Sequence, residues 1–446
     1  MKLFLGILLM VFPLAAQPMG GDVQSFQLPN GLRVLLLENH QHPFIRLQLR
    51  VVWAPPEIRE TPPSPETKSP EIKEKPSIPK PKGQTPPEPL VLGVLNQCSV
   101  GHRSRGAFNR AVEERGLSLR LSGGPDGPVW NLSGGSPEAE SAFSLLADAV
   151  TRPIPEGGDL DTLRLRLIYD IHEQGSQETA RINFLRLLER PDLALEPITE
   201  NGLGQIYLED LQRSIMATLR PGRAVLAISG DLNLSQARQL VQMNFGTWNE
   251  GIDKNSLVAP KPASSSVSSI SSISSISALT RPPMLVPSDR AETSLALPFH
   301  ASDERQRAAQ NLLSLWLPRY LGPNRCQIYP GAAGWCSLVL TTVALEASEA
   351  SLREELLAIK KSGLKAGDLA LAKALWIAGR RALALHPQGQ LSFAAKETLL
   401  GAEPSEQEIQ AVDLATFNAT LLSWLNLDSA RVLVFVGDQR PVPKTN

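Results

Sequence analysis

The chain has 446 residues, which is enough for two or three domains, and 42% of them are hydrophobic, enough for a real core. This hydrophobic content excludes a chain that is disordered throughout, and the formal net charge of -1 excludes a polycation suited to phosphate backbones. Nucleic acid is therefore not an expected partner.

The first residues have the pattern of a secretory signal. Lys2 precedes an apolar run over residues 3–14, and small residues follow it. We expect residues 1–17 to be a signal peptide and the protein to be exported, to the periplasm or the medium; a buried first strand or helix is the alternative. Stable membrane insertion is not expected, because no later apolar stretch approaches the roughly 20 residues that a transmembrane helix needs.

Two segments differ from the rest in composition. Residues 55–89 are dense in proline and in charges of both signs, and residues 264–278 are a serine tract. Neither offers enough apolar surface to offset the entropy of ordering, so we expect a mobile insertion and a mobile linker. The expected organisation is a signal peptide 1–17, a first lobe 18–252 that holds the insertion, a linker 253–280, a shorter second lobe 281–440 and a tail 441–446.

Strands flank a block of helices in the first half. Asn30-Gly31 between two short alternating segments, 26–28 and 33–37, predicts a β-hairpin. The elements expected after it are a strand at 44–53, a helix at 104–116 capped by Ser104, strands at 117–121 and 129–132, a helix opening at Ser136-Pro137, further helices to 219, a strand at 223–229 and a helix at 234–245. This order is typical of an α+β fold with helices on one face of a sheet.

Several short motifs occur in the order found in the insulinase/pitrilysin metallopeptidases. They are Leu28-Pro29-Asn30-Gly31-Leu32-Arg33-Val34, Asn201-Gly202-Leu203, Leu219-Arg220-Pro221, Gly230-Asp231 and Phe245-Gly246-Thr247-Trp248. Each is weak alone, but the ordered set over about 220 residues resembles that family. The second half is similar to a shortened repeat of the plan: 293–298 resembles the opening strand, 305–316 the first helix, 338–345 and 432–438 later strands, and material is missing between 321 and 337. The resemblance implies two homologous lobes in a clamshell, each a mainly antiparallel sheet with helices on one face.

Active members of that family carry HxxEH on a helix, where two His bind Zn²⁺ and the Glu activates the metal-bound water. Aligned on Arg103-Ser104, the motif falls at Leu90-Val91-Leu92-Gly93-Val94, and residues 89–101 contain no His, Glu or Asp. The third ligand falls at Asp170, which alone does not hold zinc. We therefore expect no metal, no cofactor and no catalysis by the chain itself.

The other polar residues do not replace the site. His172-Glu173 begins an HExxH-like pattern, but Ser176 stands in place of the second His. His40 and His42 lie at a strand end and are expected to be solvated loop residues, and His300 and His386 are isolated in the sequence. Cys98 lies in an apolar stretch, where burial makes a thiol inert. Three cysteines give no disulfide framework, although Cys326 and Cys336 either form a short-loop disulfide or remain two small hydrophobic side chains.

In this family the wall opposite the zinc donates an Arg and a Tyr to the scissile carbonyl. The resemblance makes Arg325 and Tyr329 the candidates here, with structural use in a surface loop as the alternative. Three functions remain open: a non-catalytic subunit paired with a homologous zinc-bearing HxxEH peptidase that acts on peptides, a free-standing peptide-binding scaffold, and a peptidase with an unrecognised site.

Overall fold

The computed structural model describes residues 23–54, 85–173, 175–189, 198–248, 284–288, 292–323, 325–331, 335–342, 349–384, 386–400 and 403–437. The expected signal peptide, serine tract and tail lie outside these residues, as does most of the Pro-rich insertion. Of that insertion, residues 85–89 are described, and a helix already begins at Glu88.

The first lobe, residues 23–248, is built on a six-stranded sheet with the order β1-β2-β8-β3-β6-β5. Only β2 and β8 run parallel; the other neighbours are antiparallel. The strands are β1 (Gln24–Gln27), β2 (Arg33–Glu38), β3 (Phe44–Val51), β5 (Ser118–Gly124), β6 (Gly127–Gly135) and β8 (Ala224–Gly230), and a separate small pair is β4 (Ser99–Val100) with β7 (Pro153–Ile154).

The second lobe, residues 284–437, repeats this plan. Its sheet has the order β9-β13-β10-β12-β11, again with one parallel pair, β9 and β13. Strand for strand this matches β2-β8-β3-β6-β5. The strands are β9 (Met284–Ser288), β10 (Glu292–His300), β11 (Cys326–Pro330), β12 (Trp335–Thr342) and β13 (Arg431–Gly437).

Helices complete both lobes. In the first they are α1 (Glu88–Gln97), α2 (Arg105–Glu113), α3 (Ala139–Thr151), α4 (Gly157–Glu173), α5 (Gly175–Glu189), α6 (Glu200–Gly204), α7 (Leu208–Thr218) and α8 (Leu234–Phe245). In the second they are α9 (Glu304–Leu321), α10 (Glu349–Ser362), α11 (Ala366–Ala384), α12 (Pro387–Leu400), α13 (Glu406–Ala411) and α14 (Leu414–Trp424). Within the described residues, no helix is long and apolar enough to cross a membrane.

Local chemistry sets the boundaries of several elements. Gly31 has a φ of 93°, which the turn between β1 and β2 requires and which a residue with a Cβ adopts only with strain. The Ser104 side chain accepts a hydrogen bond from the Ala107 amide at the start of α2, as predicted. Asn233 and Gln236 form a capping box at the start of α8.

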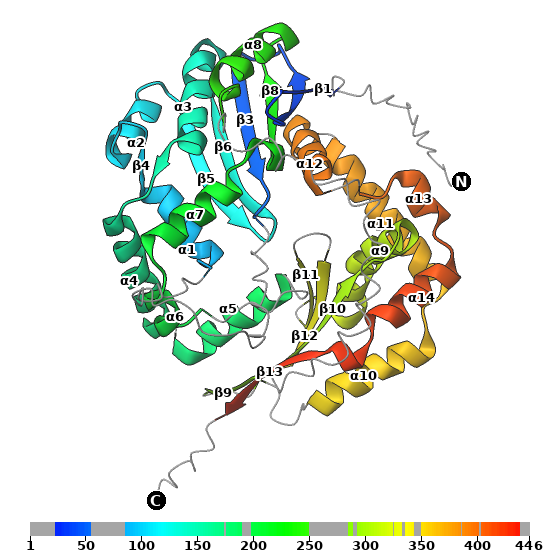
Figure 1. Cartoon of the computed structure of the whole chain (residues 1–446). Coiled ribbons are helices and arrows are strands. Elements are labelled where there is room, and N and C mark those ends of the chain that lie inside the picture. Colours follow the sequence, from blue (N-terminus) through cyan, green and yellow to red (C-terminus); the bar gives the residue numbers. More distant parts are fainter. Residues whose placement is uncertain are drawn as a thin grey trace, which may run out of the picture.

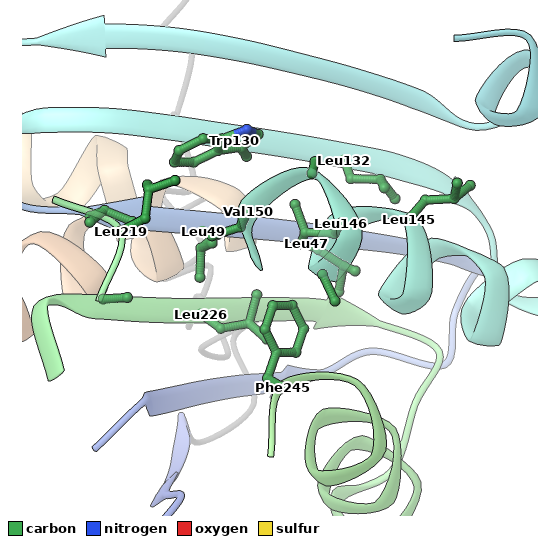
Figure 2. Close-up of a cluster of buried hydrophobic side chains, with 14 of the residues drawn as sticks. Leu47, Leu49, Trp130, Leu132, Leu145, Leu146, Val150, Leu219, Leu226 and Phe245 are labelled. Atoms are coloured by element: carbon green, nitrogen blue, oxygen red, sulfur yellow. The ribbon is translucent and has the colours of Figure 1, made fainter. Parts of the chain in front are cut away.

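The core of the first lobe lies between the sheet and its own helices. Figure 2 shows Leu47 and Leu49 of β3 and Trp130 of β6 beside Leu146 of α3 and Phe245 at the end of α8. The second lobe has an equivalent core on one face of its sheet. The predicted α+β fold with two homologous lobes is therefore confirmed.

The other face of each sheet is covered by a helix from the opposite lobe, which the sequence did not indicate (Figure 1). Helix α5 of the first lobe packs on the second sheet through Ala180, Phe184 and Leu188 against Ala296, Val339 and Leu433. Helix α12 of the second lobe packs on the first sheet through Leu391 and Ala395 against Leu35, Leu37, Val225 and Ala227. Because α5 and α12 hold the same place in the two repeats, the lobes exchange equivalent helices.

One detail of the predicted repeat was wrong, and the material expected to be missing between 321 and 337 can now be identified. The opening strand of the second sheet is β9, and residues 293–298 belong to β10, the counterpart of β3. Between Leu321 and Ser337 the chain passes directly from α9 into β11, whereas the first lobe places α1, β4 and α2 before β5. The missing material is therefore one short helix with its preceding strand.

Candidate functional site

Helix α1 occupies the place where the family resemblance puts the zinc motif. It is the first helix after the third strand of the lobe, and Pro89 and the acidic Glu88 favour a helix start there. One face, made of Leu90, Val91, Val94 and Leu95, is buried in the first core. The alignment of the motif with α1 thus puts both expected zinc positions on the buried side of a helix.

The residues on α1 do not fit a metal. Leu90 and Val94 stand where the two His are expected, and both are fully buried, with 0% exposure. Their side chains, like Gly93 in the place of the Glu, carry no donor atom. A Cβ on Gly93 would lie 2.9 Å from Leu163 Cδ2 on α4. Leu163 therefore fills the space that a glutamate side chain at position 93 would need.

Asp170, the expected third ligand, also lies on α4 and is partly exposed. It is seven residues beyond Leu163, about 10 Å along the helix axis at 1.5 Å per residue. Its carboxylate is therefore displaced from the point where α4 meets Gly93. Among the described residues, no group of three or more His, Cys, Asp and Glu is arranged to hold a metal ion.

The described histidines and cysteines have ordinary structural surroundings. His172 lies 3.3 Å from a carboxylate oxygen of Glu200, and both side chains are exposed. His40 Nδ1 lies 2.7 Å from Asp231 Oδ1, and this hydrogen bond raises the pKa of His40. Burial raises the pKa of the Cys98 thiol to about 11, so that it is protonated and unreactive at neutral pH.

Cys326 and Cys336 do not form a disulfide. Both are free and buried, on the adjacent strands β11 and β12. In the register, Cys326 lies opposite Leu340 and Cys336 opposite Pro330. The four-residue offset separates the two Cα atoms by about 13 Å, twice the span of a disulfide.

Arg325 and Tyr329 lie at opposite ends of β11 and do not converge. The Arg325 guanidinium forms an ion pair with Glu355 of α10 at 2.7 Å. The Tyr329 hydroxyl donates to Gln327 Oε1, and its ring packs beside the α5 residues on the second sheet. Their predicted role as contacts to a substrate carbonyl remains a prediction.

Strand β5 forms an open edge of the first sheet next to α1. Within the described part of the chain β5 pairs with β6 alone. Leu92 of α1 lies so close to Gly123 of β5 that a Cβ there would fall 2.0 Å from Leu92 Cδ1. A chain added to the free edge of β5 would therefore run past the part of α1 that carries Gly93.

Comparisons of the sequence with protein-family models and with curated proteins give no match. Comparison of the structure with solved structures does give matches. A peptidase M16 inactive domain from Pseudomonas fluorescens is 18% identical with a TM-score of 0.67, over 93% of this chain and 97% of that one. A protease from Helicobacter pylori is 12% identical with a TM-score of 0.68, over 93% of this chain and 99% of that one. The chain has the M16 peptidase fold.

The M16 fold is that of the insulinase/pitrilysin peptidases, so the resemblance seen in the sequence is confirmed at the level of the fold. A third similar structure is the periplasmic protease PqqL from Escherichia coli, at 14% identity and a TM-score of 0.64. This chain covers 48% of PqqL, and the separately solved first half of PqqL matches over 94% of its length. The present chain is thus equivalent in fold to one half of that protease.

The sequence did not reveal a cavity of about 340 Å³ on the face of the first sheet that α12 partly covers. Its lining includes Arg46 and Gln48 of β3, Arg120 of β5 and Asn131 of β6. The only sequence signal is the polar half of the alternation in these strands. In the sequence these polar positions indicate an ordinary solvent-facing surface. They line a cavity because α12 packs on this face of the sheet.

Proposed function

We propose that this chain is a catalytically inactive M16-like protein that binds extended peptide segments and serves as the non-catalytic subunit of an exported zinc peptidase. The observation that carries the proposal is the state of α1. Leu90 and Val94 stand in the zinc positions, and Gly93 packs on Leu163, beside a strand edge with which no other described strand pairs.

The open edge of β5 supports peptide binding. An edge strand presents unpaired backbone N–H and C=O groups, and an extended peptide satisfies them by adding one more strand. Strand β5 is seven residues long, from Ser118 to Gly124, so it offers a ladder for a segment of similar length. Backbone pairing of this kind does not depend on sequence, which suits peptides and unfolded protein segments as ligands.

Pairing with a catalytic homologue is supported by the comparison with PqqL. That protease is about twice as long as the region this chain matches, and its first half alone has the same fold. In that protease a unit of this fold is thus joined to a second half of similar length in one polypeptide. We infer that here the second, zinc-bearing unit is a separate chain, and the signal-like residues 1–17 make the periplasm the expected place of assembly.

The first experiment tests catalytic inactivity. The purified full chain is expected to contain no stoichiometric zinc by mass spectrometry and to leave an unstructured peptide uncut. About one tightly held Zn²⁺ per chain, with proteolysis that a chelator stops, would show instead that an unrecognised site is active.

The second experiment tests partnership. The chain is expected to co-purify from its host with an HxxEH-bearing homologue, burying more than roughly 1,200 Å². Adding it to the separately purified homologue should raise that partner's peptidase activity. A homologue that is fully active alone and does not bind this chain leaves the free-standing peptide-binding scaffold as the function, because β5 offers its edge without a partner.

A further inference from the structure

The cavity under α12, called the α12 cavity below, has a floor of polar side chains from four neighbouring strands. Its described lining residues are Arg46, Leu47, Gln48, Ser118, Arg120, Asn131, Leu132, Ser133, Ala227, Ser229, Leu391 and Ser392. Two of them are arginines, and none is acidic. Leu391 and Ser392 come from α12, so the second lobe supplies one wall.

The strand register arranges the floor in two rows. In the first, Ser229, Arg46, Ser133 and Ser118 lie side by side across β8, β3, β6 and β5. In the second, Ala227, Gln48, Asn131 and Arg120 do the same. Successive residues of a strand face opposite sides, so both rows point into the cavity and away from the core. The second row brings an amide and a guanidinium together at the edge of the sheet.

Hydrogen bonds fix the direction of the donors in the second row. Arg50 donates to Gln48 Oε1 at 3.0 Å, and Gln48 Nε2 donates to Asn131 Oδ1 at 2.8 Å. The Asn131 oxygen accepts this bond, and its Nδ2 has no hydrogen-bond partner among the described residues. In the described part of the chain Arg120 forms no hydrogen bond or ion pair. Asn131 and Arg120 thus offer adjacent donors at the same position of the ladder.

Donors without acceptors favour a carboxylate ligand. A planar guanidinium binds a carboxylate through two parallel hydrogen bonds, and the amide and the serine hydroxyls add further donors. Arg46 also lines the cavity and lies over the Phe44 ring at 5.3 Å, but it has a further partner of its own and is not one of these donors. Asp126 interacts electrostatically with Arg50 and Lys396, and it does not line the cavity.

The position of Arg120 connects the α12 cavity to the proposed peptide. Arg120 lies on β5, the strand to which the peptide would add. In such a pair, side chains on the same face lie about 5 Å apart, and every second peptide residue faces the cavity side. An acidic residue at one of these positions would place its carboxylate within reach of Arg120.

We propose that the α12 cavity selects peptides with a glutamate or aspartate at a position that faces Arg120 when the peptide pairs with β5. This inference rests on the proposed function, since it needs the peptide at that edge. It adds a specificity-determining residue, Arg120, and a substrate class, acidic extended peptides.

The test is fluorescence anisotropy with the full chain and two labelled ten-residue peptides that differ only by one central Glu or Gln. We expect the Glu peptide to bind about threefold more tightly, because Arg120 is exposed and solvent screens an exposed ion pair. Arg120→Gln should remove this preference and leave the affinity for the Gln peptide unchanged. Arg319→Gln, an exposed arginine of the second lobe, is the matched control and should keep the preference.

Further arms separate the possible failures. Equal affinities for the two peptides overturn the acidic preference while peptide binding stands, and a preference that survives Arg120→Gln overturns the role of Arg120. No binding of either peptide defeats the proposed function and this inference together. Free glutamate at the peptide's concentration should not compete; if it does, the ligand is a free anion and not a peptide side chain.

Discussion

The close contact between α1 and α4 predicts that Gly93→Ala destabilises the protein, although alanine is the better helix former. A glycine inside a helix is usually less stable than alanine by about 1 kcal/mol. Here the added Cβ would lie 2.9 Å from Leu163 Cδ2 and 3.1 Å from Cδ1. Leu163 is only 5% exposed and packs in the first core, so it has little room to move.

The two effects have opposite signs, and the packing term is the larger. Inserting a methyl group into a filled core costs about 1–3 kcal/mol, against about 1 kcal/mol gained in the helix. A net loss of about 1 kcal/mol is therefore expected for Gly93→Ala. Leu163→Ala alone should cost about 2–5 kcal/mol by leaving a cavity.

The double variant gives the decisive measurement. Leu163→Ala removes the three atoms that lie nearest to a Cβ at position 93, so the helix propensity becomes the larger effect. Gly93→Ala should then stabilise the Leu163→Ala background by about 1 kcal/mol, a reversal of sign. Urea unfolding followed by circular dichroism measures all four proteins. If Gly93→Ala stabilises the wild-type chain by the same amount, α1 and α4 are not in contact at the expected site of the glutamate.

Three more predictions follow from other contacts. The hydrogen bond to Asp231 raises the pKa of His40 above 6.5, so the stability that His40 contributes is complete below pH 6.5 and declines as the pH rises through the raised value. The difference in urea midpoint between wild type and His40→Asn should therefore shrink over that range. A difference that grows with pH would contradict a stabilising interaction between His40 and Asp231. Ala395→Asp puts a carboxylate at a fully buried position between α12 and the first sheet and should lower the free energy of unfolding by more than about 3 kcal/mol, whereas a loss under 1 kcal/mol would mean that α12 does not pack there. If Arg325 and Tyr329 contact the scissile carbonyl, replacing either by alanine lowers the turnover of the assembled pair with its zinc-bearing partner and leaves assembly unchanged; unchanged turnover assigns both to the structure of β11.

Much of each lobe was predictable because the signals are local. The Asn30-Gly31 turn, the Ser104 cap and the alternation in β3 act over a few residues and survive in the folded chain. The lack of zinc-ligand residues in the expected window was equally readable. A metal needs donor atoms at fixed spacing on one helix, and residues 89–101 contain no His, Asp or Glu at any register.

What only the tertiary structure decided is which distant surfaces meet. Helices α5 and α12 bury apolar side chains on the sheets of the opposite lobes. The hydrophobic effect is non-directional, so an apolar side chain in the sequence does not indicate which distant surface it packs against. The sequence likewise does not indicate that Arg325 forms an ion pair with Glu355, because the two residues lie 30 positions apart. The α12 cavity also depends on long-range packing. The local alternation predicts only that Arg120 faces solvent, and Arg120 lines a cavity because α12 packs on the same face of the sheet. Local propensity fixes the elements, but a site built from two lobes depends on long-range packing, which no short window of the sequence contains.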